Sequence, residues 1–260
     1  MMENVAFRGF SAVTPENTLT AFHRASQAGC HRISSEIRLS GDSDVFCFAD
    51  SSMHRLTGSH GWFHRLSSFE LRLRELPFGG QGSRVERIPR LEDLLDFADS
   101  EKLALQLSVP VGSSPRWRPI IESTAVRVLE ILKKWEGSLD LQLCSADRRM
   151  VKTLLEQSPW PVGAEVTRFA EGMSYLDEPK LAFLRTGCEL FIPSRRRRKG
   201  GMFLKGGLSL LNACRESGRR LYLGPVRKRA ELELLTSLEF DGILTPATAQ
   251  LSALGYRKEA

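Results

Sequence analysis

The stretch VAFRGFSAVTPENTLTAF, residues 5–22, combines a short apolar run, an Arg-Gly turn and the start of an amphipathic helix. The apolar run ends at Arg8, and the segment TPENT (14–18) opens the helix. Thr14 can cap that helix, and Glu16 is well placed against its positive end. The stretch therefore predicts a strand, a turn and a helix, the unit that repeats along α/β proteins.

Strand-like and helix-like segments alternate along the rest of the chain. Roughly eight such units in about 250 residues predict a (β/α)8 TIM barrel, so one of nine strand candidates must be minor. Residues 51–87 are rich in Gly, Ser and Arg and predict an inserted excursion within a single domain over 1–260. The strand candidates are 4–9, 31–39, 45–49, 103–109, 139–144, 161–166, 188–193, 220–226 and 241–245. The helix candidates are 16–28, 91–100, 121–135, 147–157, 204–217 and 229–238.

The composition is that of an ordinary globular protein with a basic surface. The 260 residues carry a net charge of +6 and a pI of about 9.2, which favours acidic partners. The sequence shows neither an apolar run of about 20 residues nor an apolar signal-peptide core, so we expect a cytoplasmic protein. Five cysteines without a CxxC motif fit buried thiols in a reducing compartment.

Four segments resemble the glycerophosphodiester phosphodiesterase family. They are AFRGFSAVTPENTLTAFHRASQAG (6–29), ISSEIRLSGDSDVFCFADSSMHRLTG (33–58), RIPRLEDLLDFA (87–98) and DGILTPATAQL (241–251). The resemblance implies a TIM barrel of the phospholipase-C-like phosphodiesterase type, with its site at the C-terminal ends of the strands. It also implies a divalent metal held by three carboxylates, and two histidines that act as general acid and base.

Most of those functional positions carry other residues in this chain. The two histidine positions of the family fall on Phe7 and Ala49, neither of which can transfer a proton. The three metal-ligand positions fall on Ser34, Glu36 and Gln106, so one carboxylate remains. The resemblance therefore leads us to expect no catalytic residue at these positions and no bound metal, with Mg²⁺ or Ca²⁺ only if the protein is active.

A shift of register does not restore the metal site. Side chains alternate along a strand, so Ser34, Glu36 and Arg38 share one face, and no register offers two acids there. We expect Glu36 and Asp50 to neutralise Arg8 and Arg38 within the barrel mouth, because unpaired buried charge is costly. The retained family positions are Arg8, Gly9, Pro15, Glu16, Asn17, Thr18, Glu36 and Asp50.

Three loops predicted at the C-terminal face of the barrel are basic. They contain PRWRP (115–119), SRRRRKGG (194–201) and RKR (227–229), which together hold ten positive charges. Arginine suits phosphate because its planar fork binds two oxygens, although a solvated basic rim without a ligand is the plain alternative. The candidate ligand-binding residues are Arg8, Glu16, Asn17, Glu36, Arg38, Asp50, Arg195, Arg196, Arg197 and Arg198.

These observations favour a catalytically impaired homologue that binds a small phosphate-bearing or other anionic ligand at the barrel mouth. One alternative is an active phosphodiesterase with a rebuilt site that uses Glu36, Asp50 and a histidine of the excursion. The other is an adaptor that contacts an acidic membrane surface or a polyanion through the basic rim alone. A single Trp between Arg116 and Arg118 gives little support for nucleic-acid binding.

Overall fold

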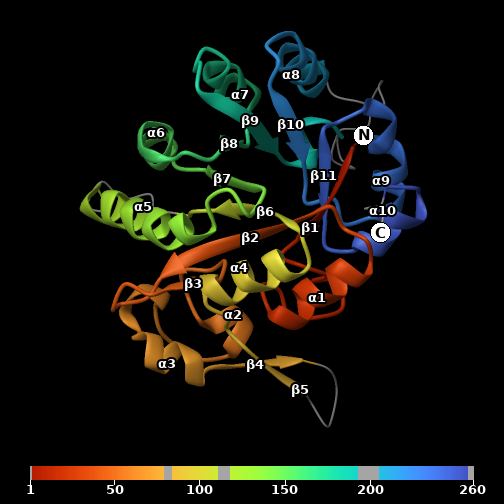
Figure 1. Cartoon of the computed structure of the whole chain (residues 1–260). Helices are drawn as coiled ribbons and strands as arrows, with labels where there is room; N and C mark the ends of the chain where they lie inside the picture. Colours follow the sequence, from red (N-terminus) through yellow and green to blue (C-terminus); the bar gives the residue numbers. More distant parts are fainter. Residues whose placement is uncertain (1, 79–83, 111–117, 193–204, 257–260) are drawn as a thin grey trace.

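Eight parallel strands close into a barrel in which each strand is bonded to its neighbours in chain order (Figure 1). The computed structural model describes residues 2–78, 84–110, 118–192 and 205–256. Closure comes from the first strand, which pairs with the last strand on one side and with β2 on the other. The barrel strands are β1 (Glu3–Phe7), β2 (Arg32–Leu39), β6 (Ala104–Ser108), β7 (Leu141–Ser145), β8 (Val162–Val166), β9 (Leu181–Thr186), β10 (Arg220–Leu223) and β11 (Gly242–Thr245). The predicted TIM barrel is confirmed.

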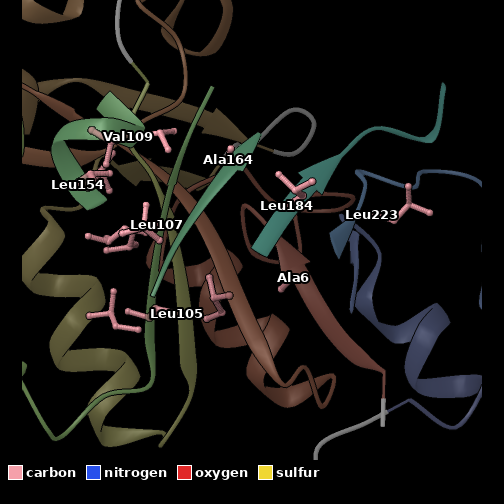
Figure 2. Close-up of a cluster of buried hydrophobic side chains, with 14 of the residues drawn as sticks. Ala6, Leu105, Leu107, Val109, Leu154, Ala164, Leu184 and Leu223 are labelled. Atoms are coloured by element: carbon pink, nitrogen blue, oxygen red, sulfur yellow. The ribbon is translucent and has the colours of Figure 1, made fainter. Parts of the chain in front are cut away.

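Helices surround the barrel and cover the apolar side chains that point outward from the strands. Leu105 and Leu107 of β6 belong to this layer with Leu154 of the helix that follows β7, as Figure 2 shows. None of the helices in the described part of the chain has both the length and the apolar content needed to cross a bilayer. The helices are α1 (Leu19–Gln27), α4 (Leu91–Ser100), α5 (Arg118–Leu132), α6 (Arg148–Gln157), α7 (Phe169–Tyr175), α8 (Lys205–Glu216), α9 (Arg229–Leu235) and α10 (Thr248–Ala253).

The predicted excursion at 51–87 is a folded layer with an apolar core of its own, drawn beneath the barrel in Figure 1. It follows β3 (Val45–Cys47), which pairs antiparallel with β2 and is the minor strand among the nine candidates. The rings of Phe48 and Phe63 stack with their centroids 4.9 Å apart. The layer comprises α2 (His54–Thr57), the 3-10 helix η1 (Phe63–Arg65), α3 (Ser68–Leu73), β4 (Glu75–Phe78) and β5 (Arg84–Arg87).

One predicted strand was wrong. The sequence predicted a strand at 188–193, but the barrel strand is β9, and Cys188–Leu190 forms the 3-10 helix η4 just after it. The apolar residues that attracted the prediction are buried in another way. The Phe191 ring packs edge-on against Phe240 with centroids 4.9 Å apart, so an apolar run can serve the core from a turn.

Candidate functional site

The turn after β1 builds one wall of the barrel mouth from residues in the left-handed backbone region. Arg8 and Asn17 have φ angles of 60° and 57°, which few non-glycine residues adopt. A Cβ on Gly9 would lie 2.6 Å from the carbonyl carbon of Ala21, so this position requires glycine. The Asn17 N–H donates to the Arg8 carbonyl at 3.0 Å and ties the two ends of the loop together. Backbone strain of this kind concentrates at functional sites.

Helix α1 begins later than the sequence predicted. Its N-cap is Thr18, whose hydroxyl accepts a hydrogen bond from the Ala21 N–H at 3.2 Å. The predicted cap was wrong, because the Thr14 hydroxyl donates to the Phe10 carbonyl at 2.7 Å instead. The left-handed conformation of the residue before Thr18 excludes it from the helix, so Glu16 lies in the loop, where its carboxylate can reach the mouth.

An ion-pair network centred on Arg8 occupies this wall. Its Nε donates to both carboxylate oxygens of Glu36 at 3.0 and 2.9 Å, and its Nη2 donates to Glu36 Oε1 at 2.8 Å. The Nη1 group of Arg8 donates to Glu16 Oε1 at 2.8 Å, and the Asn17 amide lies 3.4 Å from Glu36. Burial lowers the pKa of Arg8, but the charges of Glu36 and Glu16 and the hydrogen bonds to Glu36 together outweigh burial, so the pKa of Arg8 is raised. The predicted pairing of Arg8 with Glu36 is therefore present.

Asp50 has a different partner from the one predicted. Its carboxylate accepts from Arg55 Nε at 2.5 Å and from Arg55 Nη2 at 3.0 Å, and Arg55 also pairs with Glu16. Arg38 instead donates to the carbonyl of Ala49 at 2.9 and 2.7 Å. Burial lowers the pKa of Arg38, and the Asp50 and Glu36 charges offset part of that effect. Arg55 of the excursion thus links the two acidic residues.

The opposite wall holds two charged residues that the sequence analysis did not identify. Arg185 of β9 donates from Nη1 to the Ser34 hydroxyl at 3.2 Å, and the same nitrogen lies 3.7 Å from Glu165 Oε1 of β8. The Ser108 hydroxyl donates to the Glu165 carboxylate, and the Cys144 thiol lies 3.5 Å from it. The sequence could have identified both residues, since Glu165 and Arg185 are charged residues at inward positions of apolar strands. Arg185 was overlooked because its strand was predicted too far along the chain.

The residues at the family's metal-ligand positions do not fit a divalent cation. Ser34 already accepts a hydrogen bond from a guanidinium, and the Glu36 carboxylate is held by Arg8. The Gln106 amide lies 3.2 Å from the amide of Gln142 and carries no charge. Within the described ranges, no three His, Cys, Asp or Glu side chains are grouped so that they could hold a metal ion. Divalent Ca²⁺ and Mg²⁺ need several oxygen ligands that include free carboxylates, and a neighbouring guanidinium repels these cations.

Phe7 stands at one of the two predicted histidine positions and is surrounded by cations. The guanidinium carbons of Arg8, Arg185 and Arg227 lie 4.6, 5.4 and 6.0 Å from the centre of its ring. The ring is buried, with an exposed fraction of 4%. Guanidinium groups are attracted to the electron-rich face of an aromatic ring, so Phe7 helps to hold three positive charges at the mouth.

The three histidines of the excursion, His54, His60 and His64, lie at exposed positions. The ring centroids of His54 and His60 are 5.6 Å apart. Partial burial lowers the pKa of His64, and the charges of Arg65 and Arg38 lower it further. All three histidine side chains are thus largely in contact with solvent, in contrast to the Arg8–Glu36 ion pair of the mouth.

Much of the predicted basic rim lies outside the described residues, including Arg116, Arg195, Arg196, Arg197, Arg198 and Lys199. Of the third loop, Lys228 pairs with Glu231 at 2.6 Å and Arg229 with Glu233 at 2.9 Å. Arg227 is exposed and has no carboxylate partner within 4 Å among the residues that the structure describes. It is therefore available to an anion that enters the mouth.

Comparison with known proteins identifies one family by sequence and the same fold by structure. The sequence matches the glycerophosphoryl diester phosphodiesterase family over residues 8–248. A glycerophosphodiester phosphodiesterase of Caldanaerobacter subterraneus subsp. tengcongensis is 22% identical over 247 residues, which cover 93% of this chain and 92% of that protein. A phosphodiesterase of Oleispira antarctica, solved with its product sn-glycerol-3-phosphate, has a TM-score of 0.79 at 22% identity, covering 96% of this chain and 94% of that one. The glycerophosphodiester phosphodiesterase of Thermotoga maritima has a TM-score of 0.74 at 19% identity, covering 98% and 99%.

Proposed function

This chain belongs to the glycerophosphoryl diester phosphodiesterase family, and from that premise we propose that it is a catalytically impaired member that binds a phosphate-bearing anion at the barrel mouth. The observation that carries the proposal is that guanidinium groups contact two of the three metal-ligand positions, since Arg8 donates to Glu36 and Arg185 donates to Ser34. Glu36 is the one carboxylate left at the three metal-ligand positions, and an arginine engages it.

Proton transfer lacks both groups that the family resemblance implies. Phe7 and Ala49 have no side-chain group that can give or take a proton. General acid–base catalysis is typically worth about 10²–10⁴-fold, and acid, base and metal act as a unit. The loss of the general acid, the general base and the metal ligands therefore supports a site that binds a ligand without hydrolysing it.

The arrangement of guanidinium groups supports an anionic ligand. Arg8, Arg185 and Arg227 surround Phe7, and an arginine fork can donate two parallel hydrogen bonds to phosphate oxygens. The Oleispira phosphodiesterase, which shares this fold, was solved with sn-glycerol-3-phosphate, and this supports a phosphate ester as the ligand class. Arg195 to Arg198 lie outside the described residues, and their four positive charges in the sequence also support an anionic ligand.

The experiment pairs a hydrolysis assay with a binding assay. Hydrolysis of sn-glycero-3-phosphocholine is measured with Mg²⁺, with Ca²⁺ and with EDTA, beside a family enzyme that has both histidines. We expect no metal-dependent turnover above background, and we expect sn-glycerol 3-phosphate to raise the melting temperature.

Two results would contradict this proposal. The first is turnover that requires a divalent metal and disappears in the Glu36→Gln variant, because it would mean that a rebuilt site works. The second is the failure of small phosphate esters to raise the melting temperature while acidic vesicles still bind. That outcome would assign the basic residues to a membrane or polyanion contact instead.

A further inference from the structure

Arg185 is a buried guanidinium inside the barrel. It lies on β9 in register with Glu165 of β8 and Tyr222 of β10, and only 6% of its side chain is exposed. Alternation along the strand turns Phe183 and Arg185 inward, whereas Leu184 faces the outer layer. The β9 strand therefore brings a permanent positive charge to the C-terminal end of the barrel interior.

Arg185 donates to few oxygen atoms in the described part of the chain, and its other hydrogen-bond partner is the thiol of Cys144. A guanidinium has five N–H donors, and here one group donates to an oxygen within hydrogen-bond distance, that of Ser34 at 3.2 Å. The Glu165 carboxylate is 3.7 Å away, beyond a hydrogen bond, and it accepts the Ser108 hydroxyl instead. Arg185 is therefore paired with Glu165 by charge but not by a hydrogen bond, and an additional oxygen acceptor would stabilise its buried guanidinium further.

The hydrogen bond from Arg185 to Ser34 lies at a position where the family resemblance implies a metal ligand. Ser34 stands at the position where the family resemblance implies the first metal carboxylate, and Glu36 acts on Arg185 through its charge. A fixed guanidinium thus lies beside positions that would otherwise surround a divalent cation. Both kinds of positive charge attract phosphate oxygens, but a guanidinium needs no free metal ion.

We propose that Arg185, with Arg227 beside the same Phe7 ring, binds the phosphate group of the ligand in place of a divalent metal, so that recognition is independent of metal ions. This proposal rests on the phosphate-binding function proposed above and adds the residue that anchors the phosphate. The ligand class is a phosphate monoester or diester whose oxygens accept from both guanidinium groups.

Substitution of Glu165 distinguishes a phosphate-binding role of Arg185 from a purely structural role. The Glu165 carboxylate attracts Arg185 and repels an incoming anion, so it competes with the phosphate. Replacing Glu165 with glutamine removes the repulsion and keeps an acceptor for the Ser108 hydroxyl. A phosphate site should therefore become tighter in Glu165→Gln, whereas loss of a structural pair would leave affinity unchanged or weaker.

The experiment is isothermal titration with inorganic phosphate and with sn-glycerol 3-phosphate, in EDTA and then with Ca²⁺ or Mg²⁺. The variants are Arg185→Met, Arg185→Lys, Glu165→Gln and Arg227→Gln, and Arg215→Gln on the outer surface is the control. We expect the wild-type protein to bind in EDTA, Arg185→Met to weaken binding by about tenfold or more, and Arg185→Lys to recover it in part. We expect Glu165→Gln to strengthen binding and Arg215→Gln to leave it unchanged.

The outcomes separate this inference from the proposed function. If Arg185→Met does not fold, the double variant Arg185→Met/Glu165→Gln removes both charges, and it should still bind more weakly than Glu165→Gln alone. If the protein binds phosphate in EDTA and no Arg185 or Glu165 variant alters the affinity, the proposed role of Arg185 is overturned. The proposed phosphate-binding function would remain. Binding that appears only with a divalent metal would overturn metal independence. Absence of binding under every condition would refute the proposed function itself.

Discussion

The Arg8 guanidinium contacts both carboxylate oxygens of Glu36, with nitrogen–oxygen distances between 2.8 and 3.0 Å. The two residues come from β1 and β2, neighbouring strands of the closed barrel. Their side chains are 19% and 10% exposed, so the pair is largely removed from water. The contact holds Glu36, the one carboxylate at the three metal-ligand positions of the family, in an ion pair.

Arg8→Ala should lower the free energy of unfolding by about 3 kcal/mol, because it leaves the Glu36 carboxylate buried without its main partner. Urea denaturation at pH 7 measures this change. Arg55→Gln is the matched control, since Arg55 is half exposed and pairs with Glu16 and Asp50. Exposed pairs are typically worth about 0–1 kcal/mol. Equal effects of the two substitutions would mean that Arg8 is as well solvated as Arg55.

A metal site should appear when carboxylates are restored and the guanidinium is removed. In the triple variant Ser34→Glu/Gln106→Glu/Arg185→Met, we expect Ca²⁺ to raise the melting temperature. The stabilisation is about 2.7 kcal/mol when free metal exceeds Kd by roughly a hundredfold. Differential scanning fluorimetry with a CaCl₂ series measures the shift, and Arg185→Met alone is the control. A similar shift in the wild-type protein would show that its own residues bind the metal.

Stability should decline with rising pH in the alkaline range because of buried thiols. Burial raises the pKa of Cys47, Cys188 and Cys214 to about 12, whereas a thiol in the unfolded chain titrates near 8.5. Above that value the unfolded chain loses protons that the folded protein keeps, so unfolding becomes more favourable. Each thiol contributes a slope of about 1.4 kcal/mol per pH unit between the two values.

Urea denaturation between pH 8 and pH 10 tests the thiol prediction. The slope of unfolding free energy against pH should be smaller in Cys47→Ala/Cys214→Ala than in the wild-type protein. The native wild-type protein should also react slowly with a thiol reagent at pH 8, because thiolate is the reactive form. Rapid labelling of the native protein would contradict the raised pKa values.

Phe63→Ala should cost about 3–5 kcal/mol, because its ring is 1% exposed and fills the core of the excursion. Phe69 of α3 provides the matched control, since its ring is 71% exposed and Phe69→Ala should change stability by less than about 0.5 kcal/mol. Denaturation curves of the two variants give the comparison. A negligible effect of Phe63→Ala would mean that the layer folds independently of its apolar core.

The sequence determined the fold because the signals for it are local. Alternation of strand and helix patterns predicted the barrel, and alternation along 31–39 placed Ser34 and Glu36 on one face. The loss of both family histidines, at Phe7 and Ala49, was also readable from the chain. The predicted strand at 188–193 was wrong, because an apolar run is compatible with a strand or a packed turn and only the surrounding core selects between them.

Only the tertiary structure decided which charges meet. Arg185 and Ser34 are far apart in sequence and come together because barrel closure brings β9 and β2 around one interior. Asp50 pairs with Arg55 instead of Arg38 because α2 of the excursion lies beside the strand end. Side-chain periodicity fixes whether a residue faces inward, but the partner across a barrel depends on strand tilt and closure, which no local pattern encodes.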